Sequence, residues 1–154
     1  MIFAKWVQGL EGAQDAISLR KEVFCGEQGF DPDLEVDERD ATAWHAMVYR
    51  DGRCVAAGRA FPEGAGVWRI GRIVSHRDCR GQHMGDLVMR MAMRKAVDEG
   101  AIELVLLSQL PAMGFYARFG FMPEGEQVLD EGCPHQPMRV RADRIDWNKA
   151  CQRG

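Results

Sequence analysis

The chain has 154 residues and a formal net charge of −3. This length fits one domain with a full hydrophobic core. The negative charge argues against nucleic-acid binding, which usually needs a basic surface to neutralise phosphates. The first residues have no basic region ahead of a long apolar run, and no segment is apolar enough to span a bilayer. We therefore expect a cytoplasmic protein without a membrane partner.

Five cysteines are scattered along the chain: Cys25, Cys54, Cys79, Cys133 and Cys151. An odd number of cysteines in a chain of ordinary core size favours reduced thiols over a disulfide framework. His135 follows Cys133 closely, but no second pair of ligands stands at a zinc-like spacing. We therefore expect no metal site.

The first forty residues predict a strand, a helix and an acidic loop. Residues 2–7 read as a strand, and apolar positions between Ala13 and Phe24 predict a helix that Gly26 and Gly29 end. Residues 31–40 follow with six carboxylates, opposed only by an arginine. This loop is either a solvated turn or a partner for arginines elsewhere in the fold. A calcium loop is excluded because valine stands where glycine is needed.

The middle of the chain predicts an antiparallel meander. Residues 44–49, 54–61 and 67–75 are rich in β-forming residues. The Asp51-Gly52 pair between the first two runs is a strong hairpin signal.

The last part of the chain predicts a parallel strand reached through a helix. A helix over residues 86–99 leads to the apolar run 102–107, which is typical of a buried parallel strand after a helical crossover. Pro111 opens a short helix, and a last strand pair lies around Phe121 and residues 137–140. The elements together predict an α/β fold in which a mixed sheet joins an antiparallel meander to a parallel β-α-β half.

A candidate anion site lies between Ile70 and Gly85, where an apolar strand passes through a basic, glycine-bearing turn into a helix. Backbone N–H groups of such a turn, with the positive end of the helix dipole, can hold a phosphate. The turn lacks the Lys-Ser/Thr ending of a P-loop and the Gly-x-Gly-x-x-Gly spacing of a dinucleotide fold, which argues against ATP and NAD. It lies at the carboxyl end of a strand, where open α/β sheets bind ligands.

The sequence of this turn, Arg80-Gly81-Gln82-His83-Met84-Gly85, resembles the Arg/Gln-x-x-Gly-x-Gly/Ala signature of the GNAT superfamily of N-acetyltransferases. In that family the backbone amides of the turn hold the pyrophosphate of acetyl-coenzyme A. His83 stands where the family has glycine. Either His83 adopts a glycine-like conformation at a steric cost, or it is helical and adds its imidazole to the phosphate environment.

A second segment, Gly114-Phe115-Tyr116-Ala117-Arg118-Phe119-Gly120-Phe121, resembles the family's Phe-Tyr-x-x-x-Gly-Phe signature. The chain is also similar over nearly its whole length to a bacterial subgroup typified by ElaA and YjcF. The shared residues are 20–24, 27–29, Glu35, Asp37, Asp40, His45, Arg59, Arg72 and the closing Pro134-His135-Gln136-Pro137-Met138. The resemblance implies a single acetyltransferase domain over residues 1–154.

The resemblance also implies the cofactor contacts. Main-chain groups of Ile73, Val74 and Ser75 would pair with the pantetheine arm and polarise the thioester carbonyl. The other implied cofactor-binding residues are Arg80, Gly81, Gln82, His83, Met84, Gly85, Asp86, Ser108, Gln109 and Phe115. Tyr116 would be the general acid that protonates the departing thiolate.

The remaining roles are argued from the groups that the chemistry needs. An amine acceptor arrives mostly as ammonium, so a base must take its proton, and His45 and Glu27 are the candidates. Arg59 and Arg72 lie on neighbouring strands and would bind a carboxylate or phosphate on the acceptor, unless the acidic loop neutralises them. Alternatively, that loop attracts a cationic acceptor such as a polyamine. Cys25 has no clear activating environment, so direct transfer is favoured over an acyl-cysteine intermediate.

These observations predict an enzyme that moves the acetyl group of acetyl-coenzyme A to a primary amine, on a small molecule rather than a protein. A homodimer is a further expectation. Two alternatives stay open: a non-catalytic acyl-coenzyme A binding module, and an interaction domain that keeps the fold without the cofactor.

Overall fold

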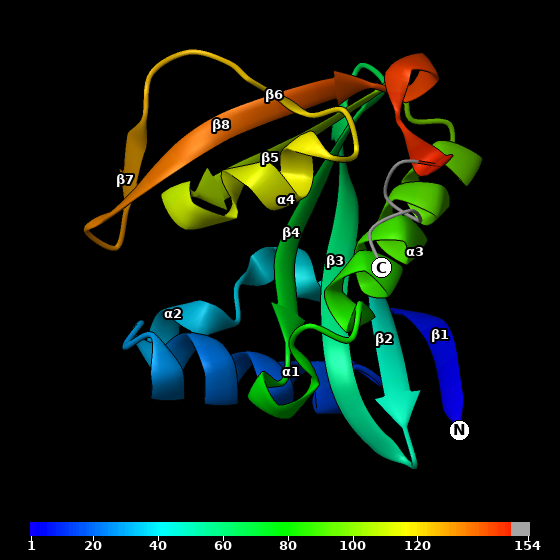
Figure 1. Cartoon of the computed structure of the whole chain (residues 1–154), viewed down its shortest axis with the longest axis vertical. Coiled ribbons are helices and arrows are strands. Elements are labelled where there is room, and N and C mark those ends of the chain that lie inside the picture. The colour runs from blue at the N-terminus through cyan, green and yellow to red at the C-terminus, as the bar shows by residue number, and fades with distance from the viewer. Residues whose placement is uncertain (149–154) are drawn as a thin grey trace. The chain divides into compact units, whose positions relative to one another are not determined.

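The structure, a computed structural model, describes residues 1–148, and Cys151 lies outside the described residues. The chain divides into two compact units. The first unit comprises Met1–Phe61 and Ile70–Lys95, and the second comprises Pro62–Arg69 and the residues from Ala96 onward. Strand β4 (Val67–Ser75) and helix α3 (Met84–Asp98), both labelled in Figure 1, contribute residues to both units.

The first unit contains the predicted meander. Strand β1 (Ile2–Gln8) pairs antiparallel with β2 (Trp44–Arg50), and β2 pairs antiparallel with β3 (Arg53–Gly64). β3 is in turn hydrogen-bonded to β4. The turn at Asp51 and Gly52 has positive φ angles of 51° and 83°, which explains why an Asp-Gly pair stands there.

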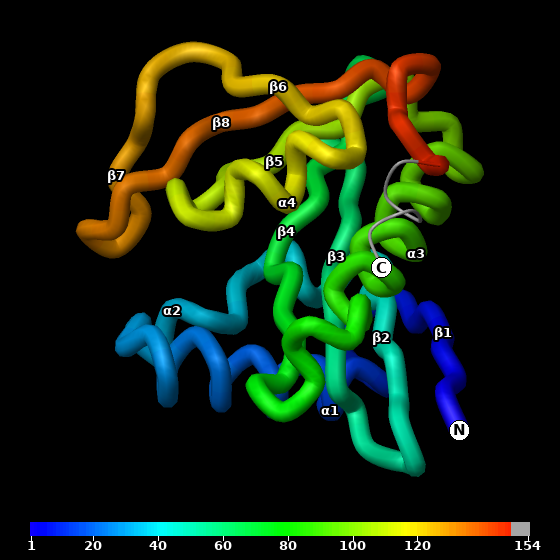
Figure 2. The backbone as a smooth tube through the Cα atoms, in the orientation of Figure 1, coloured from blue at the N-terminus to red at the C-terminus, as the bar shows by residue number. Residues whose placement is uncertain are grey.

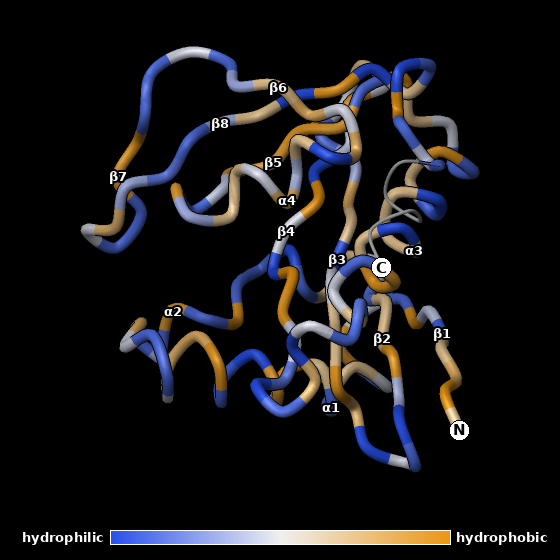
Figure 3. Tube along the Cα trace, in the orientation of Figure 1, coloured by the Kyte–Doolittle hydropathy of each residue, from blue (hydrophilic) through white to orange (hydrophobic). Residues whose placement is uncertain are grey.

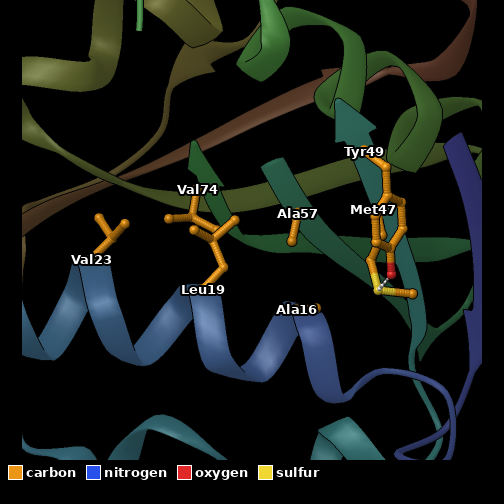
Figure 4. Packing of buried hydrophobic residues seen from close by; sticks show 7 residues of the cluster. All are labelled: Ala16, Leu19, Val23, Met47, Tyr49, Ala57 and Val74. Carbon is orange, nitrogen blue, oxygen red and sulfur yellow. Dashed lines mark hydrogen bonds between the residues drawn. The ribbon is translucent and has the colours of Figure 1, made fainter. Parts of the chain in front are cut away.

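Helix α1 (Gln14–Arg20) continues as π-helical turns over Lys21–Glu27. The sequence predicted that Gly26 and Gly29 end this helix; it runs past Gly26 to Glu27, and the chain reverses at Gly29, whose φ is +79°. One face of this helix packs on the strands through a buried cluster, shown in Figure 4, of Ala16, Leu19, Val23, Met47, Tyr49, Ala57 and Val74. The cluster packs the helix against β4 as well as β2 and β3, because Val74 belongs to β4.

The acidic loop is not a solvated turn. It folds into helix α2 (Pro32–Glu35) and a 3₁₀ turn over Glu38–Ala41, with Asp31 and Asp37 accepting from the backbone at the two N-caps. Glu35 and Asp40 are buried, at 4% and 0% exposure. Buried carboxylates need cationic partners, and three arginines supply them.

A compact turn connects β4 to α3 (Figure 2). It contains a short 3₁₀ helix over Arg77–Cys79, and α3 begins at Met84, two positions before the predicted start at residue 86. Hydrophobic and hydrophilic residues alternate along α3 in Figure 3, as expected of an amphipathic helix. Its buried positions are Val88, Met89, Ala92, Met93 and Ala96.

The second unit holds the parallel pair and the C-terminal strands. β5 (Glu103–Gln109) pairs parallel with β4 over Val67–Arg69 and antiparallel with β8 (Cys133–Arg141). β8 also pairs with β6 (Met122–Pro123) and with β7 (Val128–Asp130). A 3₁₀ turn, Leu110–Ala112, and helix α4 (Met113–Ala117) follow β5.

The predicted α/β fold with a mixed sheet is confirmed: within residues 1–148 the sheet has eight strands, largely antiparallel with one parallel pair. β7 is the strand that the sequence did not predict. No helix in residues 1–148 combines the length and the apolar character needed to cross a membrane.

Candidate functional site

In the first unit, the turn after β4 adopts the backbone conformation that a glycine-rich anion turn requires. Gly81 has a φ of +83° and His83 a φ of +66°. The carbonyl of His83 accepts the N–H of Leu87 at 3.0 Å, which makes His83 the last residue before the α3 helix. His83 therefore takes the glycine-like conformation rather than the helical one. Its Nδ1 lies 3.1 Å from Oδ2 of Asp86, on the first turn of α3.

The first residue of the turn, Arg80, joins it to two other elements. Arg80 donates from Nη1 and Nη2 to the two carboxylate oxygens of Glu27, at 2.9 and 3.1 Å, and from Nη2 to the carbonyl of Ser75 at 3.2 Å. These hydrogen bonds lower the pKa of Glu27. A carboxylate held in a bidentate ion pair is a poor proton acceptor, so this geometry argues against Glu27 as the base.

Other residues of the turn contribute to its framework. The Gln82 side chain accepts from Arg50, and the Met84 side chain packs on a buried cluster that includes Val88. His76, which precedes the turn, accepts the N–H of Asp78 at its Nδ1. The N–H of Gln82 donates to the carbonyl of Cys79 at 3.1 Å and that of Arg80 to the carbonyl of Arg77 at 3.4 Å, so a phosphate at this turn would be bound by its other backbone amides.

The strand before the turn offers main-chain groups to a ligand. The recorded pairing of β4 with β5 ends at Arg69, so Ile73, Val74 and Ser75 lie beyond that ladder. Arg72, just before them, has a φ of +51°. A residue in the left-handed conformation inside a strand changes the direction in which the following backbone N–H and C=O groups point. Gly58 of β3 provides room, because a Cβ there would lie 2.5 Å from Cδ1 of Ile73.

Three arginines meet the acidic loop in a buried ion-pair network. Arg20 donates to Glu35 at 2.8 Å and to Asp40 at 2.8 Å. Arg59 donates to Asp37 at 2.7 Å and to Asp40 at 2.9 Å. Arg72 donates to Glu35 at 2.9 Å. Burial alone would raise the pKa of Asp40, but the hydrogen bonds and charge of Arg20, with the charge of Arg59, outweigh it and hold that pKa well below its usual range.

The network bears on the two interpretations of the arginines. The Arg59 side chain is 6% exposed and its terminal nitrogens are occupied by the loop carboxylates, so it is not presented to an acceptor. Arg72 is 26% exposed, but Glu35 and Asp37 hold its guanidinium. The acidic loop thus pairs with both arginines, which favours their structural role over acceptor binding. The sequence assigned no role to Arg20, because an isolated arginine on a helix gives no sign of burial.

His45 occupies the interior rather than a surface facing a ligand. It is 1% exposed, and its Nε2 lies 3.0 Å from the carbonyl oxygen of Asp40. Burial lowers the pKa of His45. A histidine that is buried and hydrogen-bonded to the backbone has a structural role, so this placement argues against His45 as the base.

In the second unit, α4 carries the aromatic residues of the second signature. Tyr116 lies edge-to-face with Phe115 at a centroid distance of 5.1 Å and with Phe121 at 6.3 Å. Burial raises the pKa of Tyr116 to about 12, so the phenol keeps its proton at neutral pH. Among the described residues, its hydroxyl has no recorded hydrogen-bond partner.

The residues at the carboxyl end of β5 are arranged differently from the prediction. Ser108 is fully buried and its hydroxyl donates to the carbonyl of Gln109 at 2.7 Å, which argues against a hydrogen bond from this hydroxyl to pantetheine. Gln109 precedes the 3₁₀ turn without capping it by its side chain. Gln109 is in register with His135 of β8, a residue that the sequence included in a shared motif but gave no role.

The mixed sheet, the anion turn at the carboxyl end of β4 and the aromatic helix after β5 define the class of acyl-coenzyme A N-acyltransferases. Comparison with known proteins agrees: the acetyltransferase (GNAT) family matches residues 13–121, so the chain belongs to this family. YjcF of Bacillus subtilis, an uncharacterized N-acetyltransferase, is 33% identical over 130 residues, which cover 83% of this chain and 91% of YjcF. A UPF0039 protein of Mycobacterium tuberculosis is 34% identical over 143 residues, covering 86% of this chain and 88% of that protein.

Solved structures give the same assignment. An acyl-CoA N-acyltransferase from Pseudomonas aeruginosa is 30% identical with a TM-score of 0.80, over 90% of this chain and 99% of that one. Escherichia coli ElaA also has a TM-score of 0.80, at 24% identity over 90% of this chain and 99% of ElaA, and this likeness concerns the fold alone. The predicted membership of an ElaA- and YjcF-like subgroup of the GNAT family is confirmed.

Proposed function

We propose that the protein transfers the acetyl group of acetyl-coenzyme A directly to a primary amine of a small molecule. The observation that carries the proposal is the sequence of three features along one strand: the left-handed Arg72, the main chain of Ile73–Ser75 beyond the β5 ladder, and the turn at Arg80–Gly85. Together they supply hydrogen-bonding groups for a pantetheine arm and then for a pyrophosphate.

The cofactor supplies an activated thioester, and the chain's own groups act on it. The N–H groups of Ile73–Ser75 are suited to hydrogen-bond the pantetheine and the thioester carbonyl, where negative charge develops during attack. The amides of the turn and the N-terminus of α3 are suited to the pyrophosphate. A helix N-terminus stabilises an anion because its first N–H groups are unpaired and its dipole is positive.

Tyr116 is the proposed proton donor. When the amine nitrogen forms a bond to the acetyl carbon and the C–S bond breaks, the thiolate must gain a proton. The hydroxyl of Tyr116, which is protonated and has no recorded hydrogen-bond partner within residues 1–148, provides it, and the proton lost by the amine nitrogen restores the phenol through solvent. The overall reaction converts ammonium and thioester into amide, free thiol and one proton.

The test measures thiol release from acetyl-coenzyme A over a panel of amines, with glucosamine, spermidine and lysine as the first probes. The proposal expects turnover with at least one amine and a lower kcat in Tyr116→Phe by about 10²-fold or more, the usual contribution of a general acid. The matched control is Tyr49→Phe, since Tyr49 is a buried tyrosine on β2 that donates to Asp15. Turnover at the full rate by Tyr116→Phe would remove the proposed acid.

Isothermal titration separates this function from an interaction domain that has lost its cofactor. The proposal expects acetyl-coenzyme A to bind the wild-type protein. Absence of binding at millimolar cofactor would overturn it. Binding without turnover across the panel would favour a non-catalytic acyl-coenzyme A module instead.

A further inference from the structure

Arg72 has a backbone conformation that its place in the chain does not explain. Within residues 1–148, five residues other than glycine have a positive φ. Asp51, Ala65 and Glu131 lie in turns between strands, where a positive φ is ordinary. His83 directly precedes α3. Arg72, with a φ of +51°, is the member of this group that lies inside a strand, β4, where a positive φ is unfavourable.

Glycine would adopt this conformation freely, and the chain has a glycine in the adjacent position. Gly71 directly precedes Arg72, and the φ of Gly71 lies outside the left-handed region. The left-handed residue is therefore the one with a long cationic side chain. Backbone strain of this kind persists only where the surrounding structure imposes it, and it clusters at functional sites.

The guanidinium of Arg72 is held by two residues of the acidic loop. Its Nε lies 2.9 Å from Oε2 of Glu35, and its Nη2 donates to the carbonyl oxygen of Glu35 at 3.2 Å. Nη2 also lies 3.5 Å from Oδ2 of Asp37. Glu35 is the last residue of α2 and is 4% exposed, so these contacts attach β4 to a buried carboxylate.

Other arginines hold the acidic loop in place. Arg20 of α1 donates to the carboxylate of Glu35 at 2.8 Å and to its backbone carbonyl at 2.8 Å. Arg59 of β3 donates to the two carboxylate oxygens of Asp37 at 2.7 and 2.9 Å. The loop is thus attached to α1 and β3 independently of Arg72. Removal of the Arg72 side chain would therefore leave both carboxylates with a cationic partner, which favours folding of such variants.

The two residues after Arg72 are packed in separate clusters. The side chain of Val74 lies in the buried cluster of Figure 4, which includes Leu19 of α1. Ile73 packs against a second cluster, which includes Val88 of α3. With the Arg72 side chain attached to the acidic loop just before them, the peptide groups of this part of β4 are held in one orientation.

We propose that Arg72 is a positioning residue for the acetyl transfer, an inference that rests on the proposed function. Its guanidinium, bound to the acidic loop, holds residue 72 in the left-handed conformation. That conformation orients the N–H groups of Ile73–Ser75 for the pantetheine arm and the thioester carbonyl before the cofactor binds. Orientation in advance avoids the entropic cost that a flexible strand would incur on binding. Arg72 acts through the backbone and contacts neither the cofactor nor the acceptor.

The test compares wild type, Arg72→Ala and Arg72→Gly by isothermal titration with acetyl-coenzyme A and with ADP. Both variants lose the contacts to the acidic loop, but glycine adopts the left-handed conformation freely, whereas alanine disfavours it by about 5- to 30-fold. The inference expects Arg72→Ala to bind acetyl-coenzyme A about 5- to 30-fold more weakly than Arg72→Gly, because only the left-handed fraction is competent to bind. ADP carries a pyrophosphate without the pantetheine arm, so its affinity should be the same for all three proteins.

Asp51 provides the matched control. It has the same φ of +51° and also forms an ion pair, with the N-terminus, but it lies in an exposed turn of the same unit. Asp51→Ala and Asp51→Gly should bind acetyl-coenzyme A equally well. Equal binding of acetyl-coenzyme A by the two Arg72 variants, or an equal loss of affinity for ADP in Arg72→Ala, would overturn the positioning role.

A measurement on the free protein keeps this inference separate from the proposed function. Backbone NMR chemical shifts should report a left-handed residue 72 in wild type and a shift toward extended backbone in Arg72→Ala. A left-handed alanine in that variant would show that the guanidinium does not hold the conformation, and would overturn the inference whether or not the cofactor binds. If wild type has the left-handed residue but binds no acetyl-coenzyme A, the proposed function fails, and the role of Arg72 in it fails as well.

Discussion

Replacing His83 by glycine tests whether the anion turn carries backbone strain. His83 holds a φ of +66° at the position where the family signature has glycine. A residue with a Cβ in the left-handed region costs about 1–2 kcal/mol, although histidine is among the less unfavourable residues there. Glycine adopts this conformation freely, so the variant His83→Gly removes the strain.

Two costs of the His83→Gly substitution act against this relief of strain and set the net change in the free energy of unfolding. Glycine loses more backbone entropy on folding, which costs about 0.5–1 kcal/mol relative to alanine. The contact between His83 and Asp86 is also lost, and because the histidine side chain is 45% exposed this contact contributes at most about 1 kcal/mol. Comparison with His83→Ala cancels the lost contact. The expected result is that His83→Gly has a free energy of unfolding higher than His83→Ala by about 0.5–1 kcal/mol.

Urea unfolding followed by circular dichroism measures this difference at fixed pH, and thermal unfolding should separate the two variants by about 1–4 °C. We also expect His83→Gly to bind acetyl-coenzyme A at least as tightly as wild type, by isothermal titration, because a glycine amide is more open to a phosphate. Equal stability of the glycine and alanine variants would refute the strain argument.

Other predictions concern the buried network, a glycine contact and the tie between turn and helix. Asp40→Asn should lower the free energy of unfolding by about 3–5 kcal/mol in urea titrations, because two buried guanidinium groups lose their carboxylate. Since the folded-state pKa of Asp40 is depressed, its stabilisation is full above about pH 5 and is lost as the pH falls, so wild-type stability should decline on acidification more steeply than that of Asp40→Asn. Gly120→Ala should destabilise by about 2–3 kcal/mol, since φ is +107° and a Cβ would lie 2.8 Å from the carbonyl oxygen of Arg144. Glu27→Gln should raise KM for acetyl-coenzyme A about threefold by loosening Arg80, and leave S-acetylpantetheine, which lacks the pyrophosphate, unaffected.

Each of these predictions has a result that would contradict it, and Gly120→Ala also has a control variant. Gly125→Ala isolates the cost of a left-handed backbone, because φ there is +74° with nothing within 4 Å of an added Cβ, and a loss equal to that of Gly120→Ala would contradict the steric argument. A parallel acid response of wild type and Asp40→Asn would contradict the linkage. An equal rise in KM for S-acetylpantetheine with Glu27→Gln would mean that the ion pair acts on the thioester region rather than on the phosphates.

The sequence predicted what depends on local patterns. The Asp51-Gly52 turn, the alternating strands and the helix after the anion turn follow from periodicity and from residues that suit particular φ angles, and the structure confirms them. Of the two glycines predicted to end the first helix, Gly26 lies within its last turn and Gly29 follows it. Gly26 costs about 1 kcal/mol in helix propensity relative to alanine, and the packing of Val23 on Val74 and its neighbours offsets this cost.

What the sequence alone determined is the chemistry of the family: two spaced signatures and a strand–turn–helix identify an acyl-coenzyme A acyltransferase. Tertiary structure decided which polar side chains are free to act. It paired Arg59 and Arg72 with the acidic loop, buried His45 against the backbone of Asp40 and tied Glu27 to Arg80. Buried charges need partners of opposite charge, and the fold supplies these partners from distant positions in the chain. Such pairings join residues separated by up to 53 positions, and no local pattern encodes them.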